Sequence, residues 1–114
     1  MKDVYILAIE SSCDETSIAI IKNGCEDVAT TILTQMDTHA LYGGVVPEIA
    51  SRMHCENITM VLEDVFSKTT ITMNDIDAIA VTYAPGLLGS LLIGLEFAKT
   101  LSLVYKKPLI KVHH

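Results

Sequence analysis

The stretch around which the chain is organised reads Ile6-Leu7-Ala8-Ile9-Glu10-Ser11-Ser12-Cys13-Asp14-Glu15-Thr16-Ser17-Ile18-Ala19-Ile20-Ile21. Two short apolar runs rich in β-branched residues flank a polar segment. Runs of this length, bounded by turn formers, are typical of strands. The first run is apolar at both alternating sets of positions, which predicts a central strand covered on both faces. We therefore expect two strands joined by a tight acidic turn.

The turn between these strands, from Glu10 to Ser17, carries three carboxylates and four hydroxyls. Hydroxyls and backbone N–H groups in such a turn can bind a phosphate, and carboxylates can bind a metal or accept a proton. The alternative is a solvated hairpin loop stabilised by Asx turns. On this stretch alone, both interpretations stay open.

Length and composition limit the protein to one domain or part of a larger one. The formal charge of -6 over 114 residues argues against a strongly basic nucleic-acid surface on this chain. Three cysteines without metal-site spacing indicate a reducing compartment, and we expect a cytoplasmic protein. The first ten residues do not resemble a signal peptide, and no apolar run reaches the roughly 18 residues of a membrane span.

Turn and helix signals divide the first half of the chain. Asn23-Gly24 is a strong hairpin signal because both residues tolerate positive φ, and a third strand is predicted from Asp27 to Thr34. Pro47 suits the first turn of a helix. The helix is predicted from an apolar stripe at helical spacing, formed by Val46, Ile49, Ala50, Met53, Ile58, Val61, Leu62 and Val65.

The second half predicts a buried strand over 76–83, a nearly all-apolar helix over 87–105 and a strand that begins at 109. The element order is then β-β-β-α-β-α-β. Three antiparallel strands followed by two crossover strands are typical of the α/β, ribonuclease-H-like lobe of the sugar-kinase, heat-shock ATPase and actin superfamily. The expected fold is a mixed sheet with helices, and this analogy concerns the fold, not the site.

The helix over 87–105 raises the question of oligomeric state. It is apolar nearly all round, and such a helix is normally buried on every side. Small residues (Gly86, Gly89, Gly94 and Ala98) form one edge of it, which would let a second copy approach closely. The sequence therefore predicts a homodimer through this helix.

Four motifs, in order, resemble those of a single family. They are Ile9-Glu10-Ser11-Ser12-Cys13-Asp14-Glu15-Thr16, Tyr42-Gly43-Gly44-Val45-Val46-Pro47-Glu48-Ile49-Ala50-Ser51-Arg52, Ala84-Pro85-Gly86-Leu87-Leu88-Gly89-Ser90-Leu91-Leu92 and Val112-His113-His114. They resemble the catalytic subunit of tRNA threonylcarbamoyladenosine transferase, the TsaD/Gcp/Kae1 family, formerly named O-sialoglycoprotein endopeptidase. The resemblance extends from Val4 to the last residue.

The resemblance implies a cytoplasmic acyltransferase that moves a threonylcarbamoyl group from threonylcarbamoyl-adenylate to an adenosine next to the tRNA anticodon. It implies that residues 1–114 are the N-terminal lobe of a two-lobed protein whose C-terminal lobe is absent from this chain. It also implies a multi-subunit complex with a paralogous scaffold subunit and a P-loop ATPase. By this resemblance, the isolated lobe is expected to be inactive.

The site residues implied by the resemblance lie in the first, second and fourth motifs, with His39 three positions before the quoted part of the second. Asp14 and Glu15 match the family's acidic pair and are expected to be catalytic. Ser12, His39 and Glu48 are expected to contact substrate. His114 matches the first ligand of the family's metal, iron or zinc; the other ligands are missing here, so we expect no tightly bound metal.

Three other functions compete with this interpretation. A metalloendopeptidase, as in the old family name, requires a complete metal site. A non-catalytic scaffold paralogue would share the lobe but lack the histidine motif, so Val112-His113-His114 favours the catalytic subunit. A sugar or acetate kinase would show an Asp-x-Gly type of phosphate turn, which residues 11–16 do not match.

Overall fold

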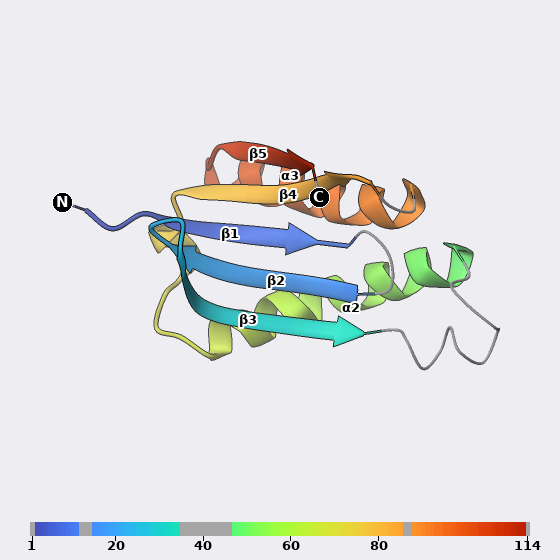
Figure 1. Cartoon of the computed structure of the whole chain (residues 1–114), viewed down its shortest axis with the longest axis horizontal. Helices are drawn as coiled ribbons and strands as arrows, with labels where there is room; N and C mark the ends of the chain where they lie inside the picture. The colour runs from blue at the N-terminus through green and yellow to red at the C-terminus, as the bar shows by residue number, and fades with distance from the viewer. Residues whose placement is uncertain (1, 12–14, 35–46, 86–87, 114) are drawn as a thin grey trace.

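A computed structural model describes residues 2–11, 15–34, 47–85 and 88–113, with the side chains of 47–51, 53–55 and 88 not described. Its five strands form one sheet in the order β3-β2-β1-β4-β5 (Figure 1). The strands are β1 (Tyr5–Glu10), β2 (Glu15–Lys22), β3 (Glu26–Thr34), β4 (Ala78–Ala84) and β5 (Leu109–His113). The β1–β2 and β2–β3 pairs are antiparallel, and β1–β4 and β4–β5 are parallel. The mixed α/β sheet predicted from the sequence is confirmed.

The turn between β2 and β3 has the conformation that its sequence predicts. Asn23 and Gly24 have φ values of 55° and 75°. Two successive residues with positive φ are typical of the hairpin turns whose twist matches the flanking strands. The turn fixes the antiparallel pairing of β2 with β3.

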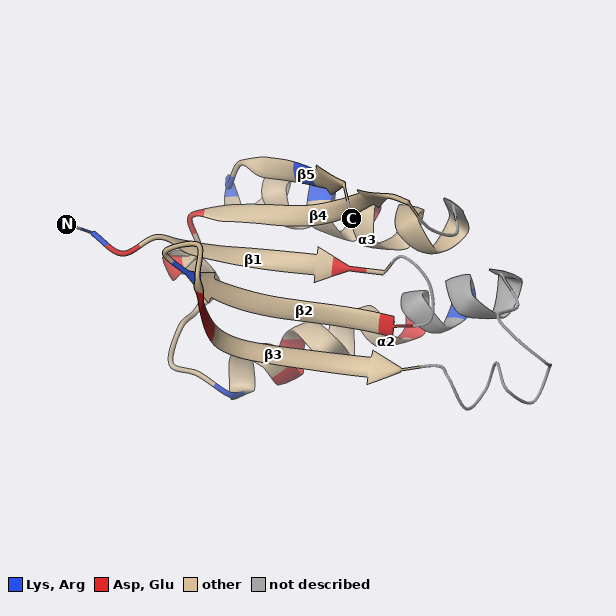
Figure 2. Ribbon diagram, viewed as in Figure 1, with Lys and Arg blue, Asp and Glu red and all other residues tan. Residues whose placement is uncertain are grey.

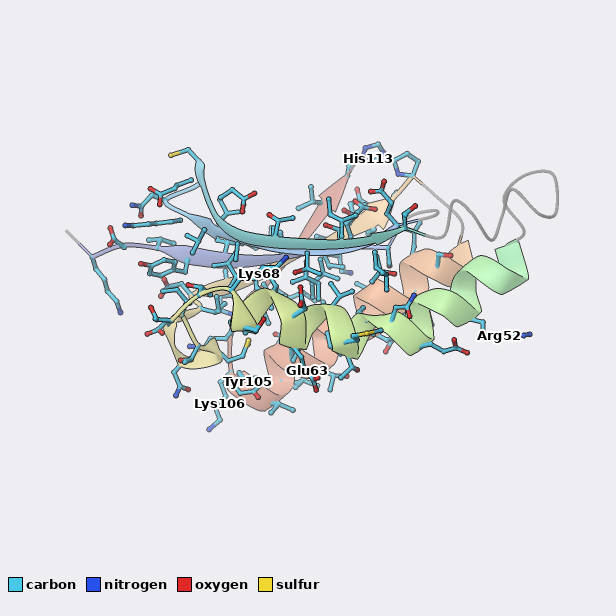
Figure 3. All side chains as sticks on the ribbon, turned by 90° about the horizontal axis from the view of Figure 1, so that it is seen from below. Arg52, Glu63, Lys68, Tyr105, Lys106 and His113 are labelled. Carbon is cyan, nitrogen blue, oxygen red and sulfur yellow. The ribbon has the colours of Figure 1, made fainter. Side chains whose placement is uncertain are left out.

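Two helices lie within the described residues, α2 (Pro47–Ser67) and α3 (Leu88–Tyr105). Helix α2 packs on β2 and β3, and α3 packs on β4 and β1. Both helices lie on the same side of the sheet, as the view in Figure 3 shows. Neither of these two described helices is long and apolar enough to cross a membrane.

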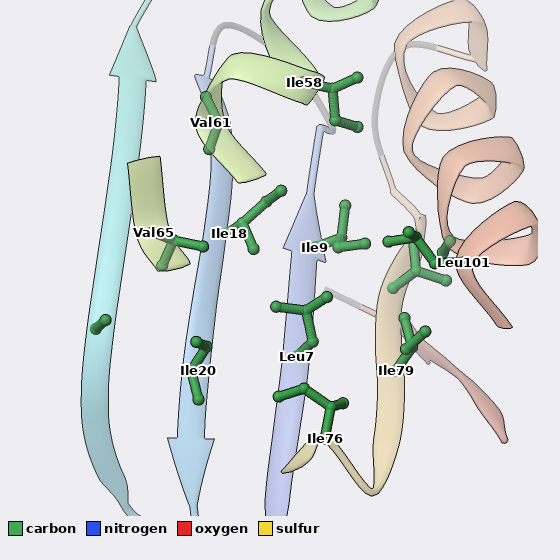
Figure 4. Close-up of a cluster of buried hydrophobic side chains, with 13 residues drawn as sticks. Leu7, Ile9, Ile18, Ile20, Ile58, Val61, Val65, Ile76, Ile79 and Leu101 are labelled. Atoms are coloured by element: carbon green, nitrogen blue, oxygen red, sulfur yellow. The ribbon is translucent and has the colours of Figure 1, made fainter. Parts of the chain in front are cut away.

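The hydrophobic core fills the space between the sheet and these helices (Figure 4). Alternate residues of each strand contribute to it because successive side chains of a strand point to opposite faces. Burying one such aliphatic side chain stabilises the fold by roughly 1.5–3 kcal/mol. The largest of these aliphatic side chains are Leu7, Ile9, Ile18, Ile20, Ile76, Ile79, Val61, Val65 and Val81.

The prediction that the first strand is covered on both faces is wrong for the part of the chain that the structure describes. Strand β1 is central, and Leu7 and Ile9 are buried under the helices. Ile6 and Ala8, on the opposite face, are only half-buried, because both described helices occupy one side. We call this second side the open face.

The strand predicted over 76–83 is displaced by two residues at its start. A 3₁₀ turn, η1 (Met73–Asp75), precedes it, and the Asp75 carboxylate accepts a hydrogen bond from the backbone N–H of Thr72 at 2.9 Å. Ile76 is fully buried but lies outside the ladder. Burial of its side chain, not pairing of its backbone, produced the apolar signal.

Two residues of the small-residue edge on which the predicted dimer was based, Gly94 and Ala98, face inward. A Cβ atom placed on Gly94 would lie 3.6 Å from Ile9 Cγ2 of the chain's own β1. Ala98 is fully buried in the core. At these two positions the edge serves contact between α3 and its own sheet, so it is not available to a second copy.

Candidate functional site

Polar side chains gather where β1, β4 and β5 end. These three strands are parallel, so their carboxyl ends meet at one edge of the sheet, and antiparallel β2 begins there (Figure 1). Glu10, Thr82 and His113 lie at or near those carboxyl ends, and Glu15 is the first residue of β2. Ligands of open α/β sheets bind outside the carboxyl ends of strands. We call this region the site edge.

Glu10 and Thr82 form the first contact at the site edge. The hydroxyl of Thr82 donates a hydrogen bond to Oε2 of Glu10 at 2.5 Å. Thr82 is buried and Glu10 is half-buried. A hydrogen bond to a carboxylate is among the stronger kinds in proteins. It fixes the end of β1 to β4 on the open face.

A shallow groove on the open face leads away from this contact. Its volume is about 220 Å³. Its floor is formed by Ala8 and by Ala19 and Ala80, which pair with Ala8 from the two neighbouring strands. Small side chains on three adjacent strands leave this hollow, and Glu10, Ser17 and Thr82 make its end at the site edge polar.

Ser11 forms a second contact, on the helix face. Its hydroxyl donates to the backbone carbonyl of Ser90 at 2.7 Å and accepts from the backbone N–H of Gly94 at 3.2 Å. Ser11 is 1% exposed. The end of β1 is therefore joined to α3 as well as to β4.

The Ser90 hydroxyl is fully buried and makes no hydrogen bond within the described part of the protein. It lies in the first turn of α3. We assign it no role.

Tyr83 and His113 place two exposed rings at the same edge. A β-bulge between Thr82 and Ala84 leaves Tyr83 without a partner in β5. Its ring meets that of His113 edge to face, with centroids 6.0 Å apart and planes at 75°. Bulges commonly redirect a side chain next to a functional site.

Among the site residues predicted from the sequence, only Glu15 has a described side chain. It is exposed at the start of β2, opposite Thr34 of β3. Glu48 is the second residue of α2, and its side chain lies outside the described residues. The other four predicted residues, Ser12, Asp14, His39 and His114, lie outside them as well.

Sequence reasoning missed the roles of Ser11, Thr82 and Tyr83. Ser11 belonged to a quoted motif, but nothing local indicated that it contacts a helix 79 positions away. Thr82 appeared as one polar residue in an apolar strand. The pairing register of β1 and β4 places Thr82 beside Glu10. The sequence of either strand alone does not show this register, because it depends on how the two strands pack in the fold.

The metal expected from the resemblance finds no ligand set in the described part of the chain. Among the side chains that the structure describes, no three His, Cys, Asp or Glu residues are grouped to hold an ion. His114, the predicted ligand, lies outside them. We therefore derive no chemical step through a metal.

The strand order and the two crossover helices define the class of protein: a lobe of the actin-like, ribonuclease-H-like superfamily. Structure comparison agrees. YeaZ from Pseudomonas aeruginosa superposes with a TM-score of 0.74 at 19% identity, covering 96% of this chain and 44% of that one. A second structure, an uncharacterized Pseudomonas aeruginosa protein with similarity to peptidase YEAZ, gives the same TM-score and identity.

Sequence comparison then identifies the family. The profile of TsaD, tRNA N6-adenosine threonylcarbamoyltransferase, matches residues 27–114. A tRNA N6-adenosine threonylcarbamoyltransferase of Bacillus subtilis is 57% identical over 113 residues, and one of Staphylococcus haemolyticus is 56% identical. The chain belongs to the TsaD family. The alignment covers 99% of this chain and 33% of each relative, so the chain spans about a third of their length.

Proposed function

We propose that this chain is the N-terminal lobe of an enzyme that transfers a threonylcarbamoyl group from threonylcarbamoyl-adenylate to adenosine next to the anticodon of tRNA. The observation that carries the proposal is the 57% identity over 113 residues to a relative with that name. The second lobe would correspond to the two thirds of the relatives that this chain does not match.

The proposed reaction is an acyl transfer. The exocyclic amine of adenosine attacks the carbonyl carbon of the mixed anhydride, so that a C–N bond forms and the C–O bond to the phosphate breaks. The adenylate leaves as AMP, and the amine loses one proton. Asp14 and Glu15 are the proposed acceptors or positioning groups for that proton. The exposed position of Glu15 at the site edge supports this assignment, because a base must reach its substrate.

The remaining residues are assigned in the same reaction. Ser12, His39 and Glu48 would contact substrate. His114 would supply one of the ligands of an iron or zinc ion in the complete protein. Since a zinc or iron site needs at least three protein ligands, the 114-residue chain should lose added metal on dialysis.

We propose that the lobe works in the cytoplasm with tRNA, a paralogous scaffold subunit and a P-loop ATPase. Its net charge of -6 supports placing most of the tRNA contact on other parts of the assembly. The isolated lobe would form homodimers through the outward side of α3, where Leu92, Leu103 and Val104 are exposed. Sedimentation that stays monomeric at all micromolar concentrations would contradict the dimer.

A chimeric enzyme tests the activity. Residues 1–113 of this chain replace the aligned third of the Bacillus subtilis relative, and transfer is measured with tRNA and threonylcarbamoyl-adenylate. We expect the chimera to modify tRNA and the 114-residue chain alone to be inactive. A chimera that folds and binds tRNA but transfers nothing would contradict the proposal. Cleavage of a glycoprotein substrate by the chimera would instead support the peptidase alternative.

A pair of variants in the chimera tests the acidic turn. Glu15→Gln should lower the transfer rate about 100-fold or more, because a general base contributes about 10²–10⁴. Glu26→Gln is the matched control, since Glu26 is also an exposed first residue of a strand and lies at the other end of the sheet. Equal rates in the two variants would remove the catalytic role from Glu15.

A further inference from the structure

The contact between Ser11 and α3 consists of two hydrogen bonds to the backbone of the helix. Ser90 and Gly94 are four positions apart, and the carbonyl of one and the N–H of the other are the partners of a single α-helical hydrogen bond. The Ser11 hydroxyl donates to that carbonyl at 2.7 Å and accepts from that N–H at 3.2 Å. The side chain of the residue that follows β1 thus bridges one rung of the hydrogen-bond ladder of α3.

The absence of a side chain at position 94 makes this bridge possible. A Cβ atom at Gly94 would lie 2.4 Å from the Ser11 Oγ and 3.3 Å from its Cβ. Any other residue at 94 would displace Ser11 or push the helix outward. An apolar residue at position 11 would fill the same space. A hydroxyl, however, both donates and accepts a hydrogen bond. The two bonds together fix the direction in which the chain leaves β1.

Ser11 acts next to a second fixed residue. Successive side chains of a strand point to opposite faces, so Glu10 is held to Thr82 on the open face and Ser11 to α3 on the helix face. Only three residues separate Ser11 from Glu15, where β2 begins. A connection this short spans at most roughly 3.3–3.6 Å per residue. Glu10 also pairs with Ser17 of β2, so the position of Glu15 depends closely on where β1 ends.

We propose that Ser11 is a positioning residue for Glu15, acting through its bridge to Ser90 and Gly94; this inference rests on the proposed transfer function. It does not touch substrate, because it is buried between the strand and the helix. Its role is to hold the exit of β1 in one orientation, so that the carboxylate of Glu15 meets the reacting amine. Small errors in such placement lower the rate of chemistry more than the affinity for substrate.

The test uses the chimeric enzyme that carries residues 1–113 of this chain. Ser11→Ala removes both hydrogen bonds and keeps the Cβ atom. We expect kcat to fall about 10- to 100-fold while the KM for tRNA changes less than about twofold. Ser11→Cys keeps a weak donor on a somewhat larger atom and should give an intermediate kcat. If the alanine variant does not fold, the kcat of the cysteine variant provides the test.

Two controls separate positioning from loss of stability. Thr100→Ala removes another hydroxyl bound to a carbonyl of α3, that of Glu96 at 2.9 Å, on the exposed side of the helix. Val65→Ala weakens the core near the end of α2, away from the site edge. Both should keep kcat within about twofold at a temperature where all variants are folded.

The possible outcomes decide the two proposals separately. An unmutated chimera without transfer activity contradicts the proposed function, and with it the inference. An active chimera in which Ser11→Ala keeps its kcat, or loses no more than Val65→Ala does, contradicts only the positioning role. A selective fall in kcat for Ser11→Ala supports it.

Discussion

The two ends of the sheet are held together by different kinds of contact. At the hairpin end, exposed charged groups meet: Lys22 lies 3.5 Å from Asp3, and Asn23 donates to Asp3 at 3.2 Å (Figure 2). At the site edge, the contacts of Ser11 and Glu10 are buried or half-buried, and their partners are 72 to 83 positions away. Water and salt screen the first kind of contact and leave the second nearly unaffected. The long-range, buried or half-buried contacts therefore lie at the end of the sheet that carries the candidate site.

The largest expected effect comes from Gly94→Ala. Within an isolated helix, alanine is better than glycine by about 1 kcal/mol, so helix propensity predicts stabilisation. The new Cβ atom, however, would lie 2.4 Å from the Ser11 Oγ. We therefore expect overpacking to lower the free energy of unfolding by about 1–3 kcal/mol. Urea unfolding measures the free energy of unfolding. A decrease supports the contact with Ser11, and an increase contradicts it.

A double variant sharpens this prediction. In Ser11→Ala/Gly94→Ala the oxygen is gone, and the nearest remaining contact of the new Cβ is the Cβ of residue 11 at 3.3 Å. The cost of Gly94→Ala should then be smaller in the Ser11→Ala background. Additive free energies would mean that the two residues do not touch in solution.

The second effect compares two threonines that each donate to a carboxylate. Thr82→Val should lower the free energy of unfolding by about 1.5 kcal/mol, because Thr82 is buried and its bond to Glu10 joins two strands. Thr30→Val, which loses an exposed bond to Asp27 three positions away, should cost within about 0.5 kcal/mol. If both variants lost the same free energy of unfolding in urea, the hydrogen bond at the site edge would be no stronger than the one near the hairpin end.

The third effect concerns the glycine of the hairpin. Gly24 has φ of +75° and nothing within 4 Å of a Cβ placed on it. Gly24→Ala should therefore cost about 1–2 kcal/mol through backbone conformation alone. Gly24→Asn should cost less, because asparagine tolerates this region better. If neither substitution changed the melting temperature, residue 24 would not have the positive φ described here.

The smallest effect is a dependence on pH at the hairpin end. The Asn23 amide and then the Lys22 ammonium hold the pKa of Asp3 below its ordinary value of 3.8. A lowered pKa gives stability that is present above the unfolded-state pKa and is lost as pH falls through the folded-state pKa. In an NMR titration, Asn23→Ala should raise the pKa of Asp3 toward 3.8. An unchanged pKa would exclude the Asn23 contact.

Lys22 gives the opposite dependence. Asp3, chiefly, raises the pKa of Lys22 above 10.5. The stability that this pair contributes is complete below the unfolded-state pKa and is lost as pH rises through the folded-state pKa. Addition of 1 M salt, at which the screening length is about 3 Å, should reduce both shifts.

The sequence by itself determined the elements and the family. Alternating apolar residues, the Asn23-Gly24 turn and the stripe beginning near Pro47 are local signals, each complete within one element or turn, and they predicted the order of strands and helices. The four motifs predicted the family that the comparisons then identified. Local patterns succeeded because backbone propensity and side-chain period are properties of neighbouring residues.

Only the tertiary structure decided which surfaces meet. Three features depend on residues far apart in the chain: the face of β1 that no described helix covers, the inward orientation of Gly94 and the bridge from Ser11 to α3. The glycine edge of α3 is equally compatible with a second copy and with the chain's own sheet. The structure resolves this choice because packing is set by the shape of both partners, and a sequence pattern describes one of them at a time.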